Sequence, residues 1–375
     1  MEHFIGLMSG TSLDGLDLVL AAFEDGQRPR VVDFQHIPFE QRVCDVMLQW
    51  NQAEAWSPDR FLALNQVLGR FMGEAVARFA KSHEHISIRA VGMHGITARH
   101  CPELVQTPIG YGVGTLQMGD PHLVAALSGL PVIFDFRHAD MALGGQGAPL
   151  APFLDHLMFR HSERGRILLN LGGIANLSFL QAGGQDVLAF DSGPANMVID
   201  SLMRRHPLKP AAFDEDGHYA AAGKVIQPLL DHCLGHGYFS RKPPKSTGRE
   251  LFGDAFTATL LEWPDIDQYN DLITTATRLT AITVSDAIRR FAPSGSFHDL
   301  IVSGGGAHNQ TLMGMLQEFC PDLEVSTSAE HGLNADAKEA LLMAALAHAH
   351  CHRIPGNLPS VTGASRKVVL GACTP

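Results

Sequence analysis

Apolar stretches alternate with glycine-bearing turns and amphipathic segments along this chain. Residues 4–20, FIGLMSGTSLDGLDLVL, place two apolar runs around a turn of Ser, Gly, Thr and Asp, which predicts two strands joined by a turn. Helical spacing of apolar residues predicts a helix over 57–82, and 87–95 predicts a buried strand that ends at a glycine turn. A helix over 121–129 and a strand over 130–136 follow. This alternation predicts an α/β layered architecture.

The second half of the chain repeats this pattern. Residues 166–180, RILLNLGGIANLSFL, predict a strand, a glycine turn and a second strand, and 186–196 predict another strand before a helix. Residues 298–319 predict a strand, a triple-glycine turn and a helix, and 335–350 predict a long final helix. Because strand, glycine turn and strand open both halves, we expect a structural duplication, although the sequence identity between the halves is negligible.

The length and composition limit the class of protein. A chain of 375 residues is too long for one hydrophobic core, so two domains are expected. A hydrophobic content of 45% and a charged content of 18% are typical of a globular protein. The net charge of −11, without a basic run, argues against nucleic acid as a partner.

Cysteine usage and the lengths of the apolar runs indicate the compartment. The six cysteines are scattered without C-x-x-C spacing, as expected for reduced thiols in the cytosol. The start of the chain, MEHFIGLMSG, lacks the basic region and long apolar core of a signal peptide. No run reaches about 18 apolar residues, so no membrane span is expected. We therefore expect a cytoplasmic protein with no membrane partner.

Three glycine-rich turns, SGTSLDG (9–15), NLGGIAN (170–176) and SGGGAHN (303–309), each follow an apolar strand. Glycine lets the backbone approach a ligand, and inward-pointing N–H groups would cradle a phosphate. Ordinary turn chemistry and close packing are the alternatives. None of the three matches the P-loop or Rossmann pattern. Three such turns on a duplicated frame predict a nucleotide held between two domains, and Asp14 and Asp17 are candidates to hold Mg²⁺.

Asp191 is the candidate general base. It lies in FDSGPAN at the end of an apolar strand, beside Gly193 and Pro194, where α/β folds place their ligands. A carboxylate can take a proton from a water or hydroxyl that attacks phosphorus or an acetal carbon. The alternative role for Asp191 is a helix N-cap or a turn acid.

Other polar residues have two interpretations each. Arg137 follows a buried strand and offers a planar fork for a carboxylate or phosphate, or it pairs with Asp135 or Asp140. Lys245 and Arg249 in PPKSTGRE either contact a phosphate or occupy an ordinary loop.

The last predicted helix carries three residues of interest. Glu339 near its start interacts favourably with the helix dipole, so its position alone does not assign it to a substrate. His348 and His352 share one helix face at i, i+4 spacing, which suits a metal ion. Because no carboxylate lies in register with them, we do not predict a metal site there.

In chain order, these blocks resemble the anhydro-N-acetylmuramic acid kinase family, within the sugar kinase/heat-shock/actin superfamily of two-domain ATPases. The matching blocks are GLMSGTSLDGLD, HGITARH, DFRHADMALGGQGAPLAP, NLGGIANLS, FDSGPAN, PKSTGRE, SGGGAHN, DAKEA and PGNLPSVTGA, and they span nearly the whole chain. The resemblance implies an α/β, actin-like ATPase fold of the ribonuclease H-like type with an interdomain cleft. We expect residues 1–138 plus 335–375 to form the first domain and 139–334 the second.

The resemblance also implies an activity. The family splits the 1,6-anhydro bond of anhydro-N-acetylmuramic acid with water and phosphorylates the freed 6-oxygen from ATP with Mg²⁺. The product is N-acetylmuramic acid 6-phosphate, in peptidoglycan recycling. By the same resemblance we expect a homodimer whose partners are ATP and a small anhydrosugar.

The family's functional positions transfer onto this chain. Asp191 matches the acid that deprotonates the attacking water. ATP-binding roles fall on Gly10, Thr11, Ser12, Leu13, Asp14, Gly15, Leu16, Asp17, Gly172, Gly173, Gly304, Gly305, Gly306 and Asn309. Asp14 would meet the metal through Mg–ATP. Substrate-binding roles fall on Ser9, Thr97, Arg137 and Glu339.

Two departures from the family pattern lie in the sugar-side blocks. Ile96 stands where the family commonly has Gln, and His138 and Ala139 follow Arg137 where further arginines are common. A related anhydrosugar such as levoglucosan, which lacks the lactyl carboxylate and the N-acetyl group, is therefore an alternative substrate. A non-catalytic sugar- or nucleotide-binding regulator is a second alternative, against which the intact Asp191 argues.

Overall fold

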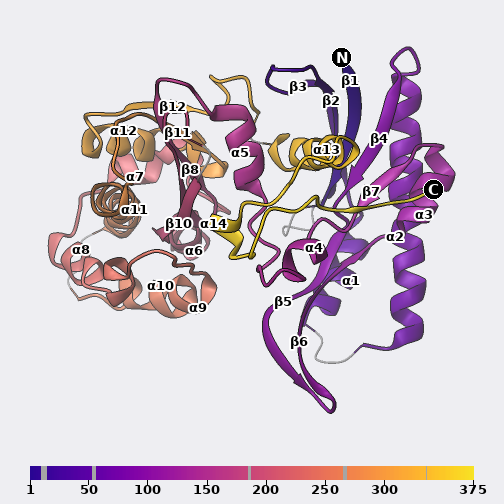
Figure 1. Cartoon of the computed structure of the whole chain (residues 1–375). Helices are drawn as coiled ribbons and strands as arrows, with labels where there is room; N and C mark the ends of the chain where they lie inside the picture. Colours follow the sequence, from indigo (N-terminus) through magenta and orange to yellow (C-terminus); the bar gives the residue numbers. More distant parts are fainter. Residues whose placement is uncertain (10–14, 53–55, 185–186, 265–267, 335) are drawn as a thin grey trace. The chain divides into compact units, whose positions relative to one another are not determined.

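The structure is a computed structural model of the chain, shown in Figure 1. It describes residues 1–9, 15–52, 56–184, 187–264, 268–334 and 336–375. The chain divides into two compact units. Unit 1 comprises Met1–Met158 and Asp336–Pro375, and unit 2 comprises Phe159–Ala335.

Unit 1 is built on a mixed sheet whose six described strands have the order β13-β7-β4-β1-β2-β3. The strands are β1 (Glu2–Met8), β2 (Gly15–Phe23), β3 (Arg30–Pro38), β4 (Ile88–Met93), β7 (Val132–Phe134) and β13 (Ala372–Cys373). The first three form an antiparallel meander, and β4 and β7 continue parallel to β1. The centres of β1 and β4 are continuously apolar because both faces of the sheet are covered.

Seven helices accompany the sheet of unit 1 in its described residues. They are α1 (Gln41–Gln52), α2 (Pro58–Ser82), α3 (Pro121–Ser128), α4 (His138–Met141), α5 (Ala151–Phe159), α13 (Lys338–Cys351) and α14 (Pro359–Thr362). Of these, α2, α3 and α13 pack against the sheet. A separate hairpin pairs β5 (Ile96–Thr107) with β6 (Gly110–Met118). The helices predicted over 57–82, 121–129 and 335–350 are confirmed as α2, α3 and α13, and the strand of 87–95 as β4.

Helix α13 approaches the sheet of unit 1 very closely. A Cβ on Gly6 of β1 would lie 1.8 Å from the Ala340 carbonyl oxygen, and one on Gly92 of β4 would lie 2.0 Å from the Met343 carbonyl oxygen. Ile5, which alternates with Gly6 along β1, belongs to the apolar cluster that includes residues of α2. Because neighbouring residues of a strand point to opposite faces, α13 and α2 cover opposite sides of the sheet.

Unit 2 contains a second mixed sheet, whose five described strands have the order β10-β9-β8-β11-β12. The strands are β8 (Gly165–Leu171), β9 (Ile174–Leu180), β10 (Val187–Pro194), β11 (Phe297–Ser303) and β12 (Glu324–Thr327). β8, β9 and β10 are antiparallel neighbours, and β11 and β12 run parallel to β8. The predicted strand–turn–strand of 166–180 is thus β8 and β9.

Unit 2 contains seven described helices, and one of them, α11 (Tyr269–Phe291), is buried along most of its length. They are α6 (Asn196–Arg204), α7 (His218–Ala222), α8 (Gln227–Leu234), α9 (Arg249–Phe252), α10 (Asp254–Leu261), α11 (Tyr269–Phe291) and α12 (Gln310–Phe319), with short 3-10 turns η1 (Glu215–Gly217), η2 (Gly237–Ser240) and η3 (Gly305–His308). In the buried helix, α11, threonine hydroxyls donate to carbonyl oxygens one turn earlier. Across the described residues of both units, no helix has the length and apolar character needed to cross a membrane.

The two sheets share one topology. Numbered in chain order within each unit, the order 3-2-1-4-5 describes both β3-β2-β1-β4-β7 and β10-β9-β8-β11-β12, with the second strand antiparallel to its neighbours. This is the ribonuclease H-like arrangement. The expected α/β fold class and the structural duplication are therefore confirmed, although the sequences of the two halves share no evident identity.

The first domain boundary differs from the expectation. Residues 139–158, assigned to the second domain on the sequence, lie in unit 1. Hydrogen bonds explain the difference, because the Asp140 carboxylate accepts from Thr362 Oγ1 at 2.7 Å and from Asn357 Nδ2 at 2.8 Å. In addition, Lys338 Nζ of α13 lies 2.7 Å from Asp155 Oδ1 of α5. These contacts bind residues 139–158 to the C-terminal part of unit 1.

Candidate active site

Asp191 lies at an irregularity of β10, where the pairing with β9 shifts between Asp191 and Gly193. Its Oδ1 accepts a hydrogen bond from Asn176 Nδ2 of β9 at 2.9 Å, and its Oδ2 accepts one from the Thr247 backbone N–H at 2.9 Å. The Tyr238 hydroxyl donates to the Asp191 backbone oxygen at 2.8 Å. The carboxylate is thus held from both sides. It caps no helix, since α6 begins at Asn196 with Ala195 as its N-cap.

Burial raises the pKa of Asp191, and the negative charge of Glu250 adds to the rise. The hydrogen bonds from Asn176 and Thr247 and the charge of Lys245 act in the opposite direction. A half-buried carboxylate with a raised pKa is a better proton acceptor than a free aspartate, so long as it is ionised at the working pH. This environment suits a general base.

Lys245 has a local role that the sequence left open. Its backbone oxygen accepts from the Asp191 N–H at 3.1 Å. Its amine lies over the rings of Tyr238, Phe291 and Phe190, at 4.7, 5.1 and 5.7 Å from their centroids. Burial lowers the pKa of this amine. Lys245 therefore packs against aromatic rings beside Asp191, whereas Arg249 is exposed at the first residue of α9.

The second and third glycine turns meet within unit 2. Strands β8 and β11 are parallel neighbours, so their carboxyl ends, at Leu171 and Ser303, lie at one edge of the sheet. A Cβ on Gly306 would lie 2.5 Å from Leu171 Cβ. The Gly172 and Gly173 carbonyl oxygens accept from the backbone N–H groups of Asn196 and Ala195, each at 3.0 Å. The predicted turns of 170–176 and 303–309 and the FDSGPAN segment are thus adjacent.

The third turn, at 303–309, has structural requirements at Gly304 and Asn309. Gly304 has a φ of +82°, and a Cβ there would lie 2.8 Å from the Leu171 carbonyl oxygen, so glycine is required on both grounds. Asn309 is buried and caps α12, with its Oδ1 accepting from the Leu312 N–H at 2.9 Å. Gly305 is the first residue of η3, between them.

The first turn is described only at its edges. Gly10, Thr11, Ser12, Leu13 and Asp14, including the predicted metal contact of Asp14, lie outside the described residues.

Four flanking residues of that turn are placed. The Ser9 hydroxyl is buried and has no hydrogen-bond partner among the described residues. Gly15 begins β2, and Leu16 is fully buried in the core of unit 1, so a nucleotide would meet only its backbone. Asp17 Oδ1 lies 2.7 Å from His36 Nδ1.

The sugar-side candidates lie in unit 1, and Arg137 has a well-defined partner there. Its guanidinium donates to His94 Nε2 at 2.9 Å and to the Gly147 carbonyl oxygen at 2.7 Å, in place of an ion pair with Asp135 or Asp140. Burial, reinforced by the Arg137 charge, lowers the pKa of His94 to about 4. His94 is therefore neutral, with Nδ1–H donating to the Gly95 carbonyl oxygen at 2.9 Å and Nε2 free of a proton.

Residues of the HGITARH and DFRHADMALGGQGAPLAP blocks, which the resemblance places on the sugar side, line one hollow of about 240 Å³ in unit 1. The lining includes His94, Gln117, Asp135 and His138. Thr97 is half-buried on β5 and pairs with Gln117 in the hairpin register.

In unit 1, Glu339 is exposed and Ile96 is buried. Glu339 is exposed in the first turn of α13, and its charge favours the protonated form of Arg137. Ile96 is buried in the apolar core of unit 1. Its side chain is therefore not exposed to a ligand, although its place in a sugar-side block of the sequence had suggested that it would be. Ile96 therefore does not favour a less polar anhydrosugar.

Several residues with clear contacts were not singled out on the sequence. They are His94, Asn176, Tyr238 and Thr247. Three of them stand inside blocks already recognised, HGITARH, NLGGIAN and PKSTGRE, which is the signal that could have found them. Tyr238 stands outside these blocks and had no such signal; its contact with Asp191 joins positions 47 residues apart.

Glycine turns at the carboxyl ends of parallel strands, in a duplicated ribonuclease H-like fold, define a protein of the two-domain ATPase class. The sequence profile described as anhydro-N-acetylmuramic acid kinase matches residues 2–375. The chain belongs to the anhydro-N-acetylmuramic acid kinase family. A curated relative from Salinibacter ruber (strain DSM 13855 / M31), named anhydro-N-acetylmuramic acid kinase, is 43% identical over 379 residues, which cover 98% of this chain and 95% of the relative.

Solved structures show weaker likenesses. A ROK family glucokinase from Streptomyces griseus, in complex with glucose and AMPPNP, has 13% identity and a TM-score of 0.38, covering 92% of this chain and 98% of the glucokinase. The activator of the 2-hydroxyisocaproyl-CoA dehydratase from Clostridium difficile, with bound ADPNP, has 12% identity and a TM-score of 0.42, covering 91% and 92% of the two chains. Likenesses this weak carry no conclusion about activity.

Proposed function

We propose that this chain is an ATP-dependent kinase that opens the 1,6-anhydro ring of 1,6-anhydro-N-acetylmuramic acid and phosphorylates it to N-acetylmuramic acid 6-phosphate. Family membership over residues 2–375 and the name of the 43% identical relative support this activity. The observation that carries the mechanism is Asp191, a half-buried carboxylate with a raised pKa close to the glycine turns of unit 2.

In the first proposed step, Asp191 takes a proton from a water molecule whose oxygen attacks the anomeric carbon. The bond from that carbon to the bridging 6-oxygen breaks, and its electron pair stays on the 6-oxygen. Positive charge of the oxocarbenium type develops on the sugar, and a nearby carboxylate stabilises it. Asn176 and Thr247 keep the carboxylate oriented for this step through their hydrogen bonds.

In the second step, the freed 6-oxygen attacks the γ-phosphorus of ATP, and the bond to the β-phosphate oxygen breaks to release ADP. Phosphoryl transfer requires mainly alignment and stabilisation of charge on the phosphate oxygens. Mg²⁺ enters with ATP as the Mg–ATP complex. Backbone N–H groups of the turns at Gly172–Gly173 and Gly304–Gly306 are the proposed phosphate and nucleoside contacts, with Gly15 and Asp17 flanking the first turn.

The sugar contacts remain proposals of the same kind. We assign Ser9, Thr97, Arg137 and Glu339 to the sugar side, and the buried Ser9 hydroxyl without a described partner supports a ligand contact there. The interdomain cleft expected from the resemblance stays a prediction.

An ATP-dependent assay of purified protein with anhydro-N-acetylmuramic acid tests the function, with the sugar phosphate followed by mass. One oxygen from ¹⁸O-labelled water should appear at the anomeric position of the product. A sugar phosphate that retains the anhydro ring would contradict the proposed first step. Levoglucosan, assayed in parallel, is expected to be the poorer substrate, and ATP and sugar binding without turnover would favour the regulator.

The Asn176→Ala variant is expected to lose activity at a higher pH than the native enzyme as the pH falls. Asn176 donates to the ionised Asp191 carboxylate and so lowers its pKa; without this bond the pKa rises further. Since the base must be ionised, the acidic limb of kcat/KM moves to higher pH, with activity recovering above it. An unmoved limb with uniformly low activity would contradict this role and indicate misfolding or lost binding instead.

We also propose a cytoplasmic homodimer, and the β5–β6 hairpin supports the second part. Its apolar side chains Leu104, Val105, Ile109, Tyr111 and Val113 are exposed in the single chain, Ile109 to 99%. Several exposed apolar side chains on one hairpin are typical of a protein–protein contact. The occupant we propose is a second copy of the chain.

The double variant Leu104→Lys/Tyr111→Lys is expected to halve the mass measured by light scattering, because charges in a buried contact oppose association. Leu208→Lys, which alters an exposed leucine of unit 2, is the matched control and should leave the mass unchanged. A dimer that survives the double variant would show that the hairpin is not the interface.

A further inference from the structure

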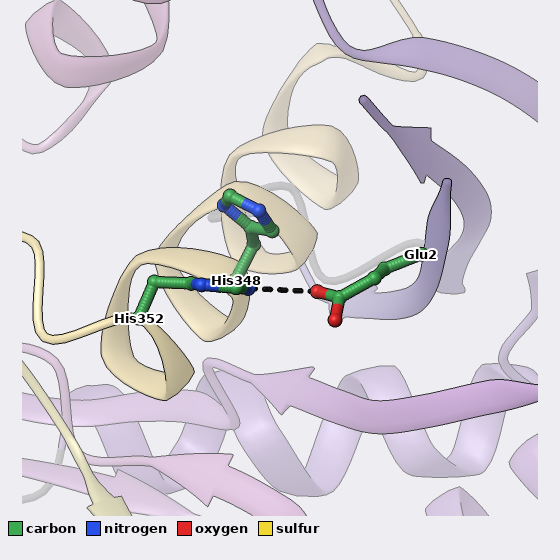
Figure 2. A group of neighbouring side chains, drawn as sticks. All are labelled: Glu2, His348 and His352. Atoms are coloured by element: carbon green, nitrogen blue, oxygen red, sulfur yellow. Dashed lines mark hydrogen bonds and ion pairs between the residues drawn. The ribbon is translucent and has the colours of Figure 1, made fainter. Parts of the chain in front are cut away.

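Glu2, His348 and His352 form a cluster at the surface of unit 1, which Figure 2 shows. The two histidines lie one turn apart at the end of α13, and Glu2 is the first residue of β1. One potential ligand atom from each residue lies within 4.8 Å of those of the other two. The carboxylate that was missing from the sequence pattern is therefore supplied by the opposite end of the chain.

Aromatic packing fixes the His348 side chain. The His348 ring stacks on Phe23 of β2, with ring centroids 4.5 Å apart, and meets the edge of Phe4 at 5.4 Å. A histidine held between two aromatic rings loses little conformational freedom on binding a ligand. The His352 ring lies 4.5 Å from the His348 ring.

Hydrogen bonds orient the carboxylate. Glu2 Oε2 lies 2.7 Å from His352 Nε2, and Glu2 Oε1 accepts a hydrogen bond from the Arg89 guanidinium. Bonding of a ligand carboxylate to a second residue is typical of metal sites, where it fixes the geometry of the ligands. The cluster thus has two imidazoles, one carboxylate and a residue that supports the carboxylate.

We propose that Glu2, His348 and His352 bind one Zn²⁺ ion. Two histidines and one glutamate form a known ligand set for zinc, in which a water molecule completes a tetrahedral site. The His352–Glu2 contact joins positions 350 residues apart, so a bound ion would tie the first strand of unit 1 to its last long helix. None of the three residues belongs to the proposed kinase machinery, and the inference does not rest on the kinase function.

Zinc binding by the intact protein tests the site, without ATP or sugar. Competition with a chromophoric chelator should show one high-affinity Zn²⁺ per chain. His352→Gln and Glu2→Gln should each weaken binding at least about a hundredfold, since loss of even a supporting partner costs about 10- to 100-fold. Zn²⁺ should raise the melting temperature of the native protein and not of these variants. Both altered residues are at least partly exposed, so the variants are expected to fold.

Two controls separate this site from other zinc-binding groups. His85→Gln removes an exposed histidine of unit 1 outside the cluster and should bind Zn²⁺ as the native protein does. Cys351→Ser removes the thiol next in sequence to His352 and should also leave binding unchanged. The proposal is overturned if the native protein binds no Zn²⁺, if the cluster variants bind it normally, or if only Cys351→Ser abolishes binding.

Discussion

The Asp191→Asn variant is expected to open and phosphorylate the anhydrosugar at least about a hundredfold more slowly than the native enzyme, because general-base catalysis contributes about 10²- to 10⁴-fold. Asparagine has nearly the same shape and can still accept a hydrogen bond, but it cannot take a proton from water. The loss should therefore appear in kcat, measured as ADP and sugar phosphate formed at saturating substrate. Binding of ATP should change little.

Asp200→Asn is the matched control for this variant. Asp200 lies on α6 of the same unit, is also partly buried, and has a pKa raised by burial to about 6, so the chemical change is the same. It is not part of the proposed site, and its variant should keep native activity. Equal activity of the Asp191 variant and the native enzyme would refute the base assignment; equal losses in both variants would show that any buried carboxylate of unit 2 matters for folding.

Asp140→Ala is expected to lower the free energy of unfolding of unit 1 by about 4 kcal/mol. Asp140 is fully buried, and its carboxylate accepts from the Gly147 N–H, Asn357 Nδ2 and Thr362 Oγ1 at 2.7 to 2.8 Å. Removing it deprives three buried donors of this acceptor, and each buried group that loses a hydrogen bond costs about 1–3 kcal/mol. The Gly147 N–H loses the one acceptor that it has among the described residues, whereas Asn357 Nδ2 and Thr362 Oγ1 can still donate to the carbonyl oxygens of Arg366 and Leu358. Urea unfolding followed by tryptophan fluorescence provides the measurement, in a Trp50→Phe/Trp263→Phe background that leaves Trp56, in unit 1, as the single tryptophan.

The same change at an exposed aspartate gives the control. The Asp254 side chain is 85% exposed and pairs only at the surface with Arg205, so Asp254→Ala should cost less than about 1 kcal/mol. A small effect of Asp140→Ala, comparable with this control, would mean that the segment 139–158 is held to unit 1 by other contacts.

Local patterns in the sequence carried much of the fold and part of the site. Strand and helix periodicity predicted α2, β4 and α13, and the glycine turns placed at the ends of β8 and β11 do meet in unit 2. Asp191 could be selected because a strand end beside a Gly-Pro turn is a local feature. Its role stays a prediction, as do those of the other site residues.

Long-range contacts could not be predicted from one sequence. The domain boundary was misplaced because Asp140 finds its partners Asn357 and Thr362 more than 200 positions away. For Arg137 the sequence offered a ligand contact or an ion pair with Asp135 or Asp140, and the structure shows instead a hydrogen bond to a neutral His94. The substitution at Ile96 suggested a changed ligand surface, whereas the fold turns that side chain into the core.

The discontinuous composition of unit 1 has a consequence for biosynthesis. Unit 2 is one uninterrupted stretch, Phe159–Ala335, whereas α13, which covers Gly6 and Gly92, is translated after it. During translation, residues 1–158 are therefore synthesised before the helix that covers one face of their sheet. Residues 159–335, by contrast, can form their own core as soon as they have left the ribosome. We therefore expect unit 2 to complete its core before unit 1 does.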